Sequence, residues 1–478
     1  MLFLFTLLTI FVIGTLLLLK TKSERHFIVF LIRTKHFLKF IDEVAKITPK
    51  FWKFVADLAI VISFSGLGAA YLSKYRKESR NLDIIILIFG ILAVLMWARD
   101  LLLLIVMLCF LLIGILSLSK LKNPLFDFIV ATSLISSIFL SAMPWYLAIF
   151  EGIFGLLAIV FGSLIEHAFA ITSGQSTMPG VSPIIPWIEA GEWGFVIPGL
   201  GIFVPLGYGL ISLILLLVVH EFSHGILARV HKLDLKSTGL LTLGLIPIGA
   251  FVEPDEEKFN ETESIVKMRV LSMGSFSNLM LAILSLLLFI FLIMPSNGWV
   301  VKDSNISNIE NGTSIMAVNY INISPESHTA ATMNALLFSN RVYTIKNSTI
   351  ENKSVVNVTT SKGIFLVKSE ELLRVKLRYV PRFRYNYDFL GTNIFAILVG
   401  ILFWTYFFNF NVALVNLLPI VPFDGGKMVI ELISMFKLSE PVVKKIVYAF
   451  LFIGLLIILI NAYPLLDMLF EWLFLTIT

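Results

Sequence analysis

The chain has 478 residues, of which 58% are hydrophobic and 14% charged, and its mean hydropathy is +0.91. A soluble domain of this length could not keep such a composition in water, so we expect an integral membrane protein in contact with the lipid bilayer. The net charge of +5 is small and forms no basic patch for nucleic acid, and the single cysteine, Cys109, excludes a disulfide framework and a cysteine-rich zinc site.

Apolar runs that reach or approach the roughly 20 residues of a spanning helix recur along the chain. They predict about eight to ten passes: Leu2 to Leu19, Phe54 to Leu72, Leu82 to Leu118 as one or two passes, Leu125 to Phe150, Ile153 to Ile171, Val204 to Val219, Val270 to Met294, Phe389 to Leu418 and Ile446 to Leu466. We interpret the first run as a retained anchor, because it lacks a basic start and a small-residue cleavage site. The mixed basic and apolar stretch from Lys20 to Lys50 is expected to lie along the interface as amphipathic helix.

The motif HEFSHG, His220 to Gly225, directly follows the apolar run LLLVV. On a helix, His220 and His224 are four positions apart and share a face, so both imidazoles can meet one metal ion. Glu221 lies about a quarter turn away, where it can reach a metal-bound water without being placed as a ligand. Ionisable residues inside a membrane segment cost roughly 2.5 to 3.5 kcal/mol each on insertion scales, which favours a metal site over a chance pattern.

Asp424 is the best candidate for the third protein ligand that a catalytic zinc requires. It interrupts a second apolar run, FFNFNVALVNLLPIVPF, and is followed by Gly425 and Gly426, which let the backbone come close. As an alternative, Asp424 caps the helix expected at Lys427 to Phe436, since aspartate is a good N-cap residue.

The charged stretch Arg229 to Arg269 separates the HEFSHG helix from the next apolar run, and its lysines and arginines near both ends place it on the cytosolic side. Within it, Thr238 to Pro254 has strand-forming residues broken by glycine and proline. This pattern predicts either an ordinary hairpin or an edge strand that holds an extended, unwound peptide.

Residues 297–388 are polar and contain strand-like pieces such as Asn340 to Ile350 and Gly363 to Val380. Six Asn-x-Ser/Thr sequons crowd into this region, at Asn305, Asn311, Asn322, Asn347, Asn352 and Asn357. The crowding favours an extracytoplasmic domain, which one helix would separate from the cytosolic stretch.

HEFSHG and NLLPIVPFDGG resemble the HExxH helix and the NxxPxxPxDGG-type segment of the site-2 protease family of intramembrane zinc metalloproteases, over roughly residues 180–465. The resemblance implies one Zn²⁺ per chain, held by His220, His224 and Asp424, with Glu221 as general base. It also implies a substrate-orienting asparagine. Asn416 matches that element, and so does Asn278 in GSFSN, where Ser275 replaces the family's proline.

The family often carries a PDZ-like domain between these helices, and NRVYTIKN, Asn340 to Asn347, is similar to the GDxIxxING strand of such domains. The resemblance therefore predicts a multi-pass α-helical membrane protein with a small extracytoplasmic mixed α/β, PDZ-like domain. The expected organisation is an N-terminal helical region of unassigned role, the first half of the membrane core, the PDZ-like domain and the second half of the core, at residues 1–172, 173–296, 297–388 and 389–478.

The activity that the resemblance implies is hydrolysis of a peptide bond within or near a transmembrane segment, as in regulated intramembrane proteolysis. The expected partners are membrane-protein substrates, single-pass or other, and a site-1-type protease that cuts them first. The active site would lie towards the cytosolic side. Two other readings stay open, a zinc-binding membrane transporter or receptor and an inactive protease-like scaffold.

Overall fold

A computed structural model represents the chain, and it divides the chain into two compact units. Unit 1 comprises residues 1–181, 214–280 and 409–478, and unit 2 comprises residues 182–213 and 281–408. The described residues are 24–26, 29–75, 81–97, 105–109, 111–112, 123–140, 142–189, 191–243, 246–294, 299–323, 325, 327–337, 343–345, 354–384, 388–389 and 392–477. The expected anchor, Leu2 to Leu19, and most of Asn340 to Ile350 lie outside them.

Five helices in the described part of the chain are long and apolar enough to cross a membrane. They are α3 (Pro49–Ser73), α9 (Leu206–Val230), α11 (Ser264–Leu292), α14 (Ile394–Val415) and α16 (Glu440–Ile477). Each coincides with a predicted apolar run, because a helix satisfies its own backbone hydrogen bonds while its side chains stay apolar. The multi-pass helical class is thus confirmed.

Four further apolar helices among the described residues are shorter, with 10 to 17 residues: α4 (Asn81–Met96), α6 (Pro124–Phe139), α7 (Trp145–Phe154) and α8 (Leu156–Thr172). The prediction of one pass from Leu125 to Phe150 is wrong, because this run forms two helices. Pro144 occupies the N-cap of α7, where proline disfavours a helical residue before it and donates no backbone hydrogen bond.

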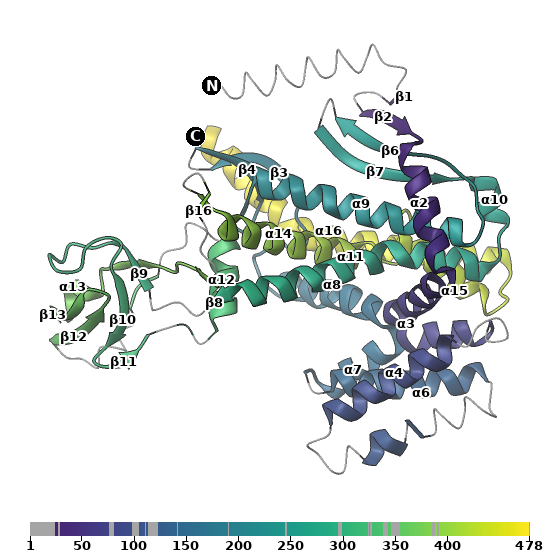
Figure 1. Cartoon of the computed structure of the whole chain (residues 1–478), viewed down its shortest axis with the longest axis horizontal. Coiled ribbons are helices and arrows are strands. Elements are labelled where there is room, and N and C mark those ends of the chain that lie inside the picture. The colour runs from purple at the N-terminus through teal and green to yellow at the C-terminus, as the bar shows by residue number, and fades with distance from the viewer. Residues whose placement is uncertain are drawn as a thin grey trace. The chain divides into compact units, whose positions relative to one another are not determined.

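Strands of the N-terminal region join the hairpin that follows HEFSHG (Figure 1). β1 (Glu24–His26), β2 (Val29–Thr34), β6 (Leu235–Leu243) and β7 (Ile246–Pro254) form one antiparallel sheet in that order. The hairpin predicted from Thr238 to Pro254 is confirmed. The prediction of amphipathic helix from Lys20 to Lys50 is right for α2 (His36–Ile47). It is wrong for β1 and β2, because the pairing of β2 with β6 overrides the local helix propensity.

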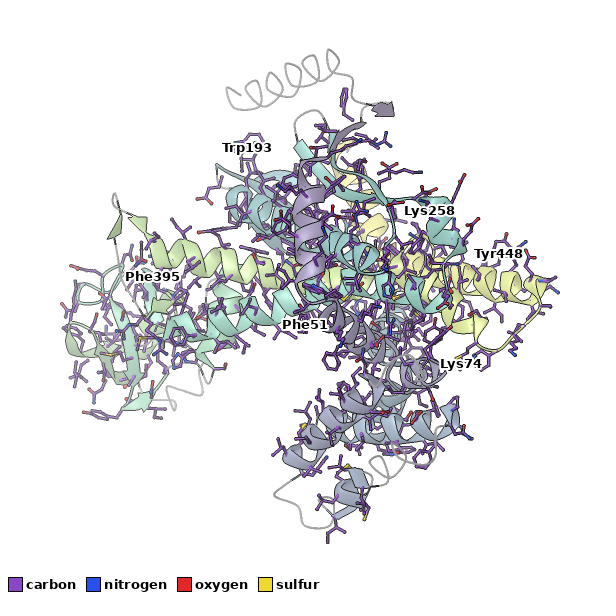
Figure 2. The ribbon with its side chains drawn as sticks, turned by 45° about the vertical axis from the view of Figure 1, so that its right-hand side comes forward. Phe51, Lys74, Trp193, Lys258, Phe395 and Tyr448 are labelled. Atoms are coloured by element: carbon purple, nitrogen blue, oxygen red, sulfur yellow. The ribbon has the colours of Figure 1, made fainter. Side chains whose placement is uncertain are left out.

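The N-terminal helices α2 and α3 lie beside the helices of the motif region (Figure 1), and they share a core with them although more than 130 residues of chain separate the two regions. Ile41 of α2, Ala56 of α3, Leu227 of α9 and Met273 of α11 all belong to it and are buried. Two short helices complete this part of unit 1, α10 (Glu256–Glu261) and α15 (Asp424–Ser434). Lys258 of α10 is labelled in Figure 2.

Unit 2 contains two larger antiparallel sheets. One consists of β3 (Ile185–Glu189), β4 (Glu192–Ile197) and β5 (Ile202–Pro205). The other has the order β13-β12-β10-β9-β14, with β11 paired to β10, and is built from β9 (Trp299–Asp303), β10 (Ser314–Val318), β11 (Ile321–Asn322), β12 (Val355–Thr360), β13 (Gly363–Lys368) and β14 (Lys376–Arg378).

Short helices and strand pairs complete the described part of unit 2. They are α12 (His328–Leu337), α13 (Ser369–Leu372), β8 (Ile293–Met294) paired with β15 (Arg382–Phe383), and β16 (Asp388–Phe389) paired with β17 (Thr392–Asn393). Both strands and short helices occur between residues 299 and 378, and a separate core of buried aliphatic side chains holds this sheet together. The PDZ-like likeness, its extracytoplasmic position and the four domain boundaries stay predictions.

Candidate metal centre

The helix α9 carries His220, Glu221 and His224 near its C-terminal end. One turn of helix brings the two imidazoles together, with their Nε2 atoms 3.2 Å apart and their rings nearly perpendicular at 79°. His220 is buried and His224 half-buried. The four-residue spacing thus produces the convergence that the sequence predicts.

Asp424 reaches the same point from the first position of α15, directly after the turn at residues 416–423 that connects α14 to α15. The N–H of Gly425 donates to the carbonyl of Asn416 over 2.7 Å and closes this turn. A Cβ on Gly425 would overlap the backbone of Leu417, and one on Gly426 would overlap the backbone of Ile420, so both positions require glycine. The alternative in which Asp424 caps the helix is wrong, because Phe423 is the N-cap and Asp424 is already helical.

The three candidate ligand atoms form a nearly equilateral triangle. Oδ2 of Asp424 lies 3.3 Å from Nε2 of His220 and 3.2 Å from Nε2 of His224, and the two nitrogens are 3.2 Å apart. Tetrahedral Zn²⁺ with bonds of about 2.0–2.1 Å separates its ligands by about 3.3 Å. These three residues could therefore hold a divalent metal ion with little movement.

The charge of Asp424 also suits a metal ligand. Burial alone would raise the pKa of this carboxyl, but the adjacent imidazoles of His224 and His220 outweigh burial and hold that pKa below its usual value. Asp424 is therefore ionised at neutral pH, as a carboxylate ligand must be.

Both imidazoles are held at the nitrogen that faces away from the triangle. Nδ1 of His224 lies 2.7 Å from the carbonyl of Val270, an acceptor that fixes the proton on Nδ1 and frees Nε2 for a metal. Nδ1 of His220 lies 3.1 Å from the amide of Asn278, whose Oδ1 is buried with no hydrogen-bond partner among the described residues. A half-turn of that amide lets Oδ1 accept the Nδ1 proton, so the orphaned oxygen fits a His220 that also presents Nε2 to a metal.

Gly274 of α11 makes room for the two rings. A Cβ at this position would overlap Nε2 of His224 and the ring of His220. Glycine in the middle of a helix costs about 0.5–1 kcal/mol relative to alanine, so its presence here is explained by the space that the imidazoles need.

Glu221 faces the pocket beside the triangle. Its Oε2 accepts a 3.1 Å hydrogen bond from the backbone N–H of Val252 in β7. The pocket has a volume of about 570 Å³ and is lined by His220, Glu221, His224, Phe251, Val252, Glu253, Pro254, Glu256, Phe259, Asn260, Val270, Leu271, Asp424 and Lys427. The pocket wall thus combines the three candidate metal ligands, the carboxylate of Glu221, which is not a ligand, and the strand β7 of the hairpin.

Four of the six residues singled out from the sequence meet at this pocket, namely His220, Glu221, His224 and Asp424. Asn278 contacts the outer nitrogen of His220, while Asn416 holds the Asp424 turn through its backbone. Substrate orientation by either asparagine stays a prediction. Sequence reasoning did not assign the contacts of Val252, Val270 and Gly274, although Gly274 belongs to the GSFSN element and Val252 to the segment Thr238 to Pro254; only Gly274, a glycine inside an apolar helix, carries a readable signal.

The fold and the site define a multi-pass membrane protein with a candidate metal centre at the end of an apolar helix. The sequence profile described as peptidase family M50 matches residues 208–461, which is more than half of the chain and includes all six residues. The chain belongs to this family, which is the site-2 protease family of membrane metalloproteases.

A curated relative extends the comparison. An uncharacterized protein of Methanocaldococcus jannaschii is 26% identical over 268 residues, which make up 55% of this chain and 64% of the relative. The match thus spans less than two thirds of that relative's length. Residues 1–207 precede the part of the chain that the family profile covers.

Proposed function

We propose that the protein is an intramembrane zinc metalloprotease that hydrolyses a peptide bond within or near a transmembrane segment. The observation that carries this proposal is the triangle of His220, His224 and Asp424, with a fourth side chain, Glu221, beside it in the same pocket. Three protein ligands and a carboxylate outside the set are the parts that a hydrolytic zinc site uses. Membership of the family supports the same reaction class.

Zn²⁺ bound at the triangle would polarise the scissile carbonyl and lower the pKa of a water to about 7. Glu221 is the general base: it takes one proton from the attacking water while the water oxygen bonds to the carbonyl carbon. Glu221 then returns that proton to the amide nitrogen as the C–N bond breaks, which releases a carboxylic acid and an amine that ionise to carboxylate and ammonium. Val252 orients the Glu221 carboxylate through its N–H.

The strand β7 is suited to hold the substrate. In the described sheet β6 lies between β2 and β7, so β7 is an edge strand, and its residues Phe251 to Pro254 line the pocket. A transmembrane helix hides each scissile carbonyl in its own hydrogen bonds, so cleavage requires local unwinding and a new backbone partner. Addition of the unwound peptide to β7 would supply that partner beside Glu221.

Charged residues and sequons support one sidedness for the protein, and membership of the family supports its regulation. Lysines and arginines near both ends of Arg229 to Arg269 support a cytosolic position for the pocket, whose wall this stretch provides. The sequons between residues 305 and 357 support an extracytoplasmic position for the sheet around β10. In this arrangement a site-1-type protease trims the outer part of a membrane-protein substrate before the intramembrane cut, as in regulated intramembrane proteolysis.

Zinc content and cleavage test the proposal together. We expect about one zinc per purified chain and loss of zinc in Asp424→Ala, with Asp255→Ala as a control that removes a helix cap in the same unit. Liposomes holding the protein and a panel of single-pass segments, with and without helix-breaking glycine and proline, would show cleavage by mass spectrometry of the fragments. A folded wild type without zinc contradicts the proposal. Zinc-bound protein that cuts no segment would favour a receptor, transporter or inactive scaffold.

A further inference from the structure

A buried ion pair connects the N-terminal region to the metal centre. Asp57 of α3 and Arg269 of α11 are 2% and 4% exposed. Nε of Arg269 donates to Oδ1 of Asp57 over 2.7 Å, and its second nitrogen donates to Oδ2 over 2.9 Å. Asn81 donates a third hydrogen bond to Oδ2 over 2.7 Å. The carboxylate is thus held on both oxygens.

The pair is adjacent to the support of a candidate metal ligand. Arg269 precedes Val270, whose carbonyl holds Nδ1 of His224. Further along the same helix, Gly274 lies against both imidazoles and Asn278 contacts Nδ1 of His220. The position of α11 along its axis therefore decides the orientation of both histidines.

Three polar contacts to α3, at different positions along α11, hold α11 in place along its axis. Tyr71 contacts Ser264 over 2.7 Å, Asp57 binds Arg269, and the hydroxyl of Ser272 donates to the carbonyl of Ala56 over 3.4 Å. α3 is kinked at Ser65, so Tyr71 contacts α11 from one helical segment of α3, and Ala56 and Asp57 contact it from the other. Apolar contacts between the two helices are non-directional, whereas a bidentate arginine–carboxylate pair has one geometry.

Stability alone gives a weak reason for such a pair. Removing two charges from water is costly, and apolar residues of similar volume often replace a buried ion pair without loss of stability. What an ion pair adds is a defined register between two helices, which a metal centre needs because its ligands must stay in place. Asp57 also lies outside residues 208–461, the part that the family profile covers.

We propose that Asp57 is a positioning residue for the metal centre: through Arg269 it fixes the register of α11 and thereby the imidazoles of His220 and His224. The inference rests on the proposed function for the presence of a bound metal. It gives the N-terminal region a role, since α3 would be a permanent part of the catalytic core.

Cobalt(II) bound to the purified full-length protein tests this inference without reference to proteolysis. Visible absorption of Co²⁺ reports ligand geometry, and titration reports affinity. We expect Asp57→Asn to change the absorption spectrum and weaken Co²⁺ binding by about tenfold, the lower end of the range for residues that orient metal ligands. Asp234→Asn breaks an exposed ion pair with Lys258 in the same unit and touches no contact between α3 and α11, so its spectrum should match that of the wild type.

A second variant covers the case in which Asp57→Asn does not fold. Asp57→Leu with Arg269→Met removes both charges at once and leaves no unpaired ion, so it should fold and still show the altered spectrum. A folded variant of either kind with the wild-type spectrum and affinity overturns the positioning role alone. A wild type that binds no Co²⁺ overturns the metal centre and this inference with it.

Discussion

The backbone N–H of Val252 donates a 3.1 Å hydrogen bond to the carboxylate of Glu221, which joins the strand β7 to the helix α9 beside the candidate metal ligands. Glu221 is one residue from His220, yet it faces the hairpin and the pocket while His220 faces Asp424. A proposed proton carrier and a proposed substrate-binding strand are therefore in direct contact.

Glu221→Gln should abolish cleavage and leave zinc bound. Glutamine keeps the size of the side chain and an oxygen that can accept from Val252, but it cannot take a proton from water. We expect cleavage to fall by about 10²- to 10⁴-fold, the usual contribution of general acid–base catalysis, with an unchanged zinc content. The control is Glu253→Gln, a second pocket glutamate, which instead binds Ser237 and Arg33. Cleavage at the wild-type rate in Glu221→Gln would rule out this mechanism.

Gly274→Ala tests whether the two imidazole rings need the space that this glycine leaves. In an ordinary helix this change adds about 0.5–1 kcal/mol to the free energy of unfolding. Here the new methyl group would overlap the rings of His220 and His224, so we expect weaker zinc binding in a protein that still folds. Competition with a fluorescent zinc chelator measures the affinity, and Gly162→Ala is the control because a Cβ there meets open space. Equal zinc affinity in both variants would show that the rings have room to move.

The site was predictable where it depends on local patterns. The spacing of His220 and His224 puts both on one helical face, and the two glycines after Asp424 indicate a close turn; all three side chains indeed meet. The role of β2 could not be read from the sequence, since its pairing with β6 joins segments about 200 residues apart. Strand formation there depends on that partner more than on propensity.

The sequence indicates that Asp57 and Arg269 each need a partner of opposite charge. Asp57 lies inside the apolar run Phe54 to Leu72, and Arg269 directly precedes the run from Val270. Isolated opposite charges in two apolar helices are expected to pair with each other. The tertiary packing decides which of the isolated charges pair with each other, and the sequence alone does not reveal that packing.

Removal of the metal should lower the unfolding temperature. Zinc at the triangle would link α9 to α15, about 200 residues further along the chain, and binding to the folded state alone stabilises it. We expect a chelator to lower the unfolding temperature of the wild type and zinc to restore it, while Asp424→Ala responds to neither. Differential scanning fluorimetry in detergent checks this, and a wild type that does not respond to chelator would count against a structural contribution of the metal.

Ala250→Pro tests the open edge of β7. The N–H of Val252 points away from β6 towards Glu221, and alternate residues of a strand point the same way, so the N–H of Ala250 is also directed outward. Proline is tolerated at such an edge position but removes the donor. We expect a folded, zinc-binding protein that cleaves transmembrane segments at least about tenfold more slowly, from the loss of one backbone contact to substrate. Ala250→Val keeps the N–H and should cleave normally; equal rates in both would mean that substrate does not pair here.

Deletion of the sheet between β9 and β14 should broaden the range of segments that are cut. This sheet has its own buried core, which includes Val301, Ile315 and Val358, so its loss should not unfold the membrane helices. Its ends are already close, because Met294 of β8 pairs with Arg382 of β15, so a short Gly-Ser linker can replace residues 297–379.

The same liposome panel would measure the effect, with the outer part of each segment varied in size. If the sheet screens substrates by bulk, the deleted protein should cut segments with large outer parts that the wild type rejects, at unchanged zinc content. An unrelated small domain inserted at residues 297–379 separates two forms of screening. Restored rejection would mean that size alone is sensed, because the insert brings bulk without the surface of the native sheet. Continued broad cleavage would mean that the native sheet recognises substrate directly, and an unchanged range in the deleted protein would show that it screens nothing.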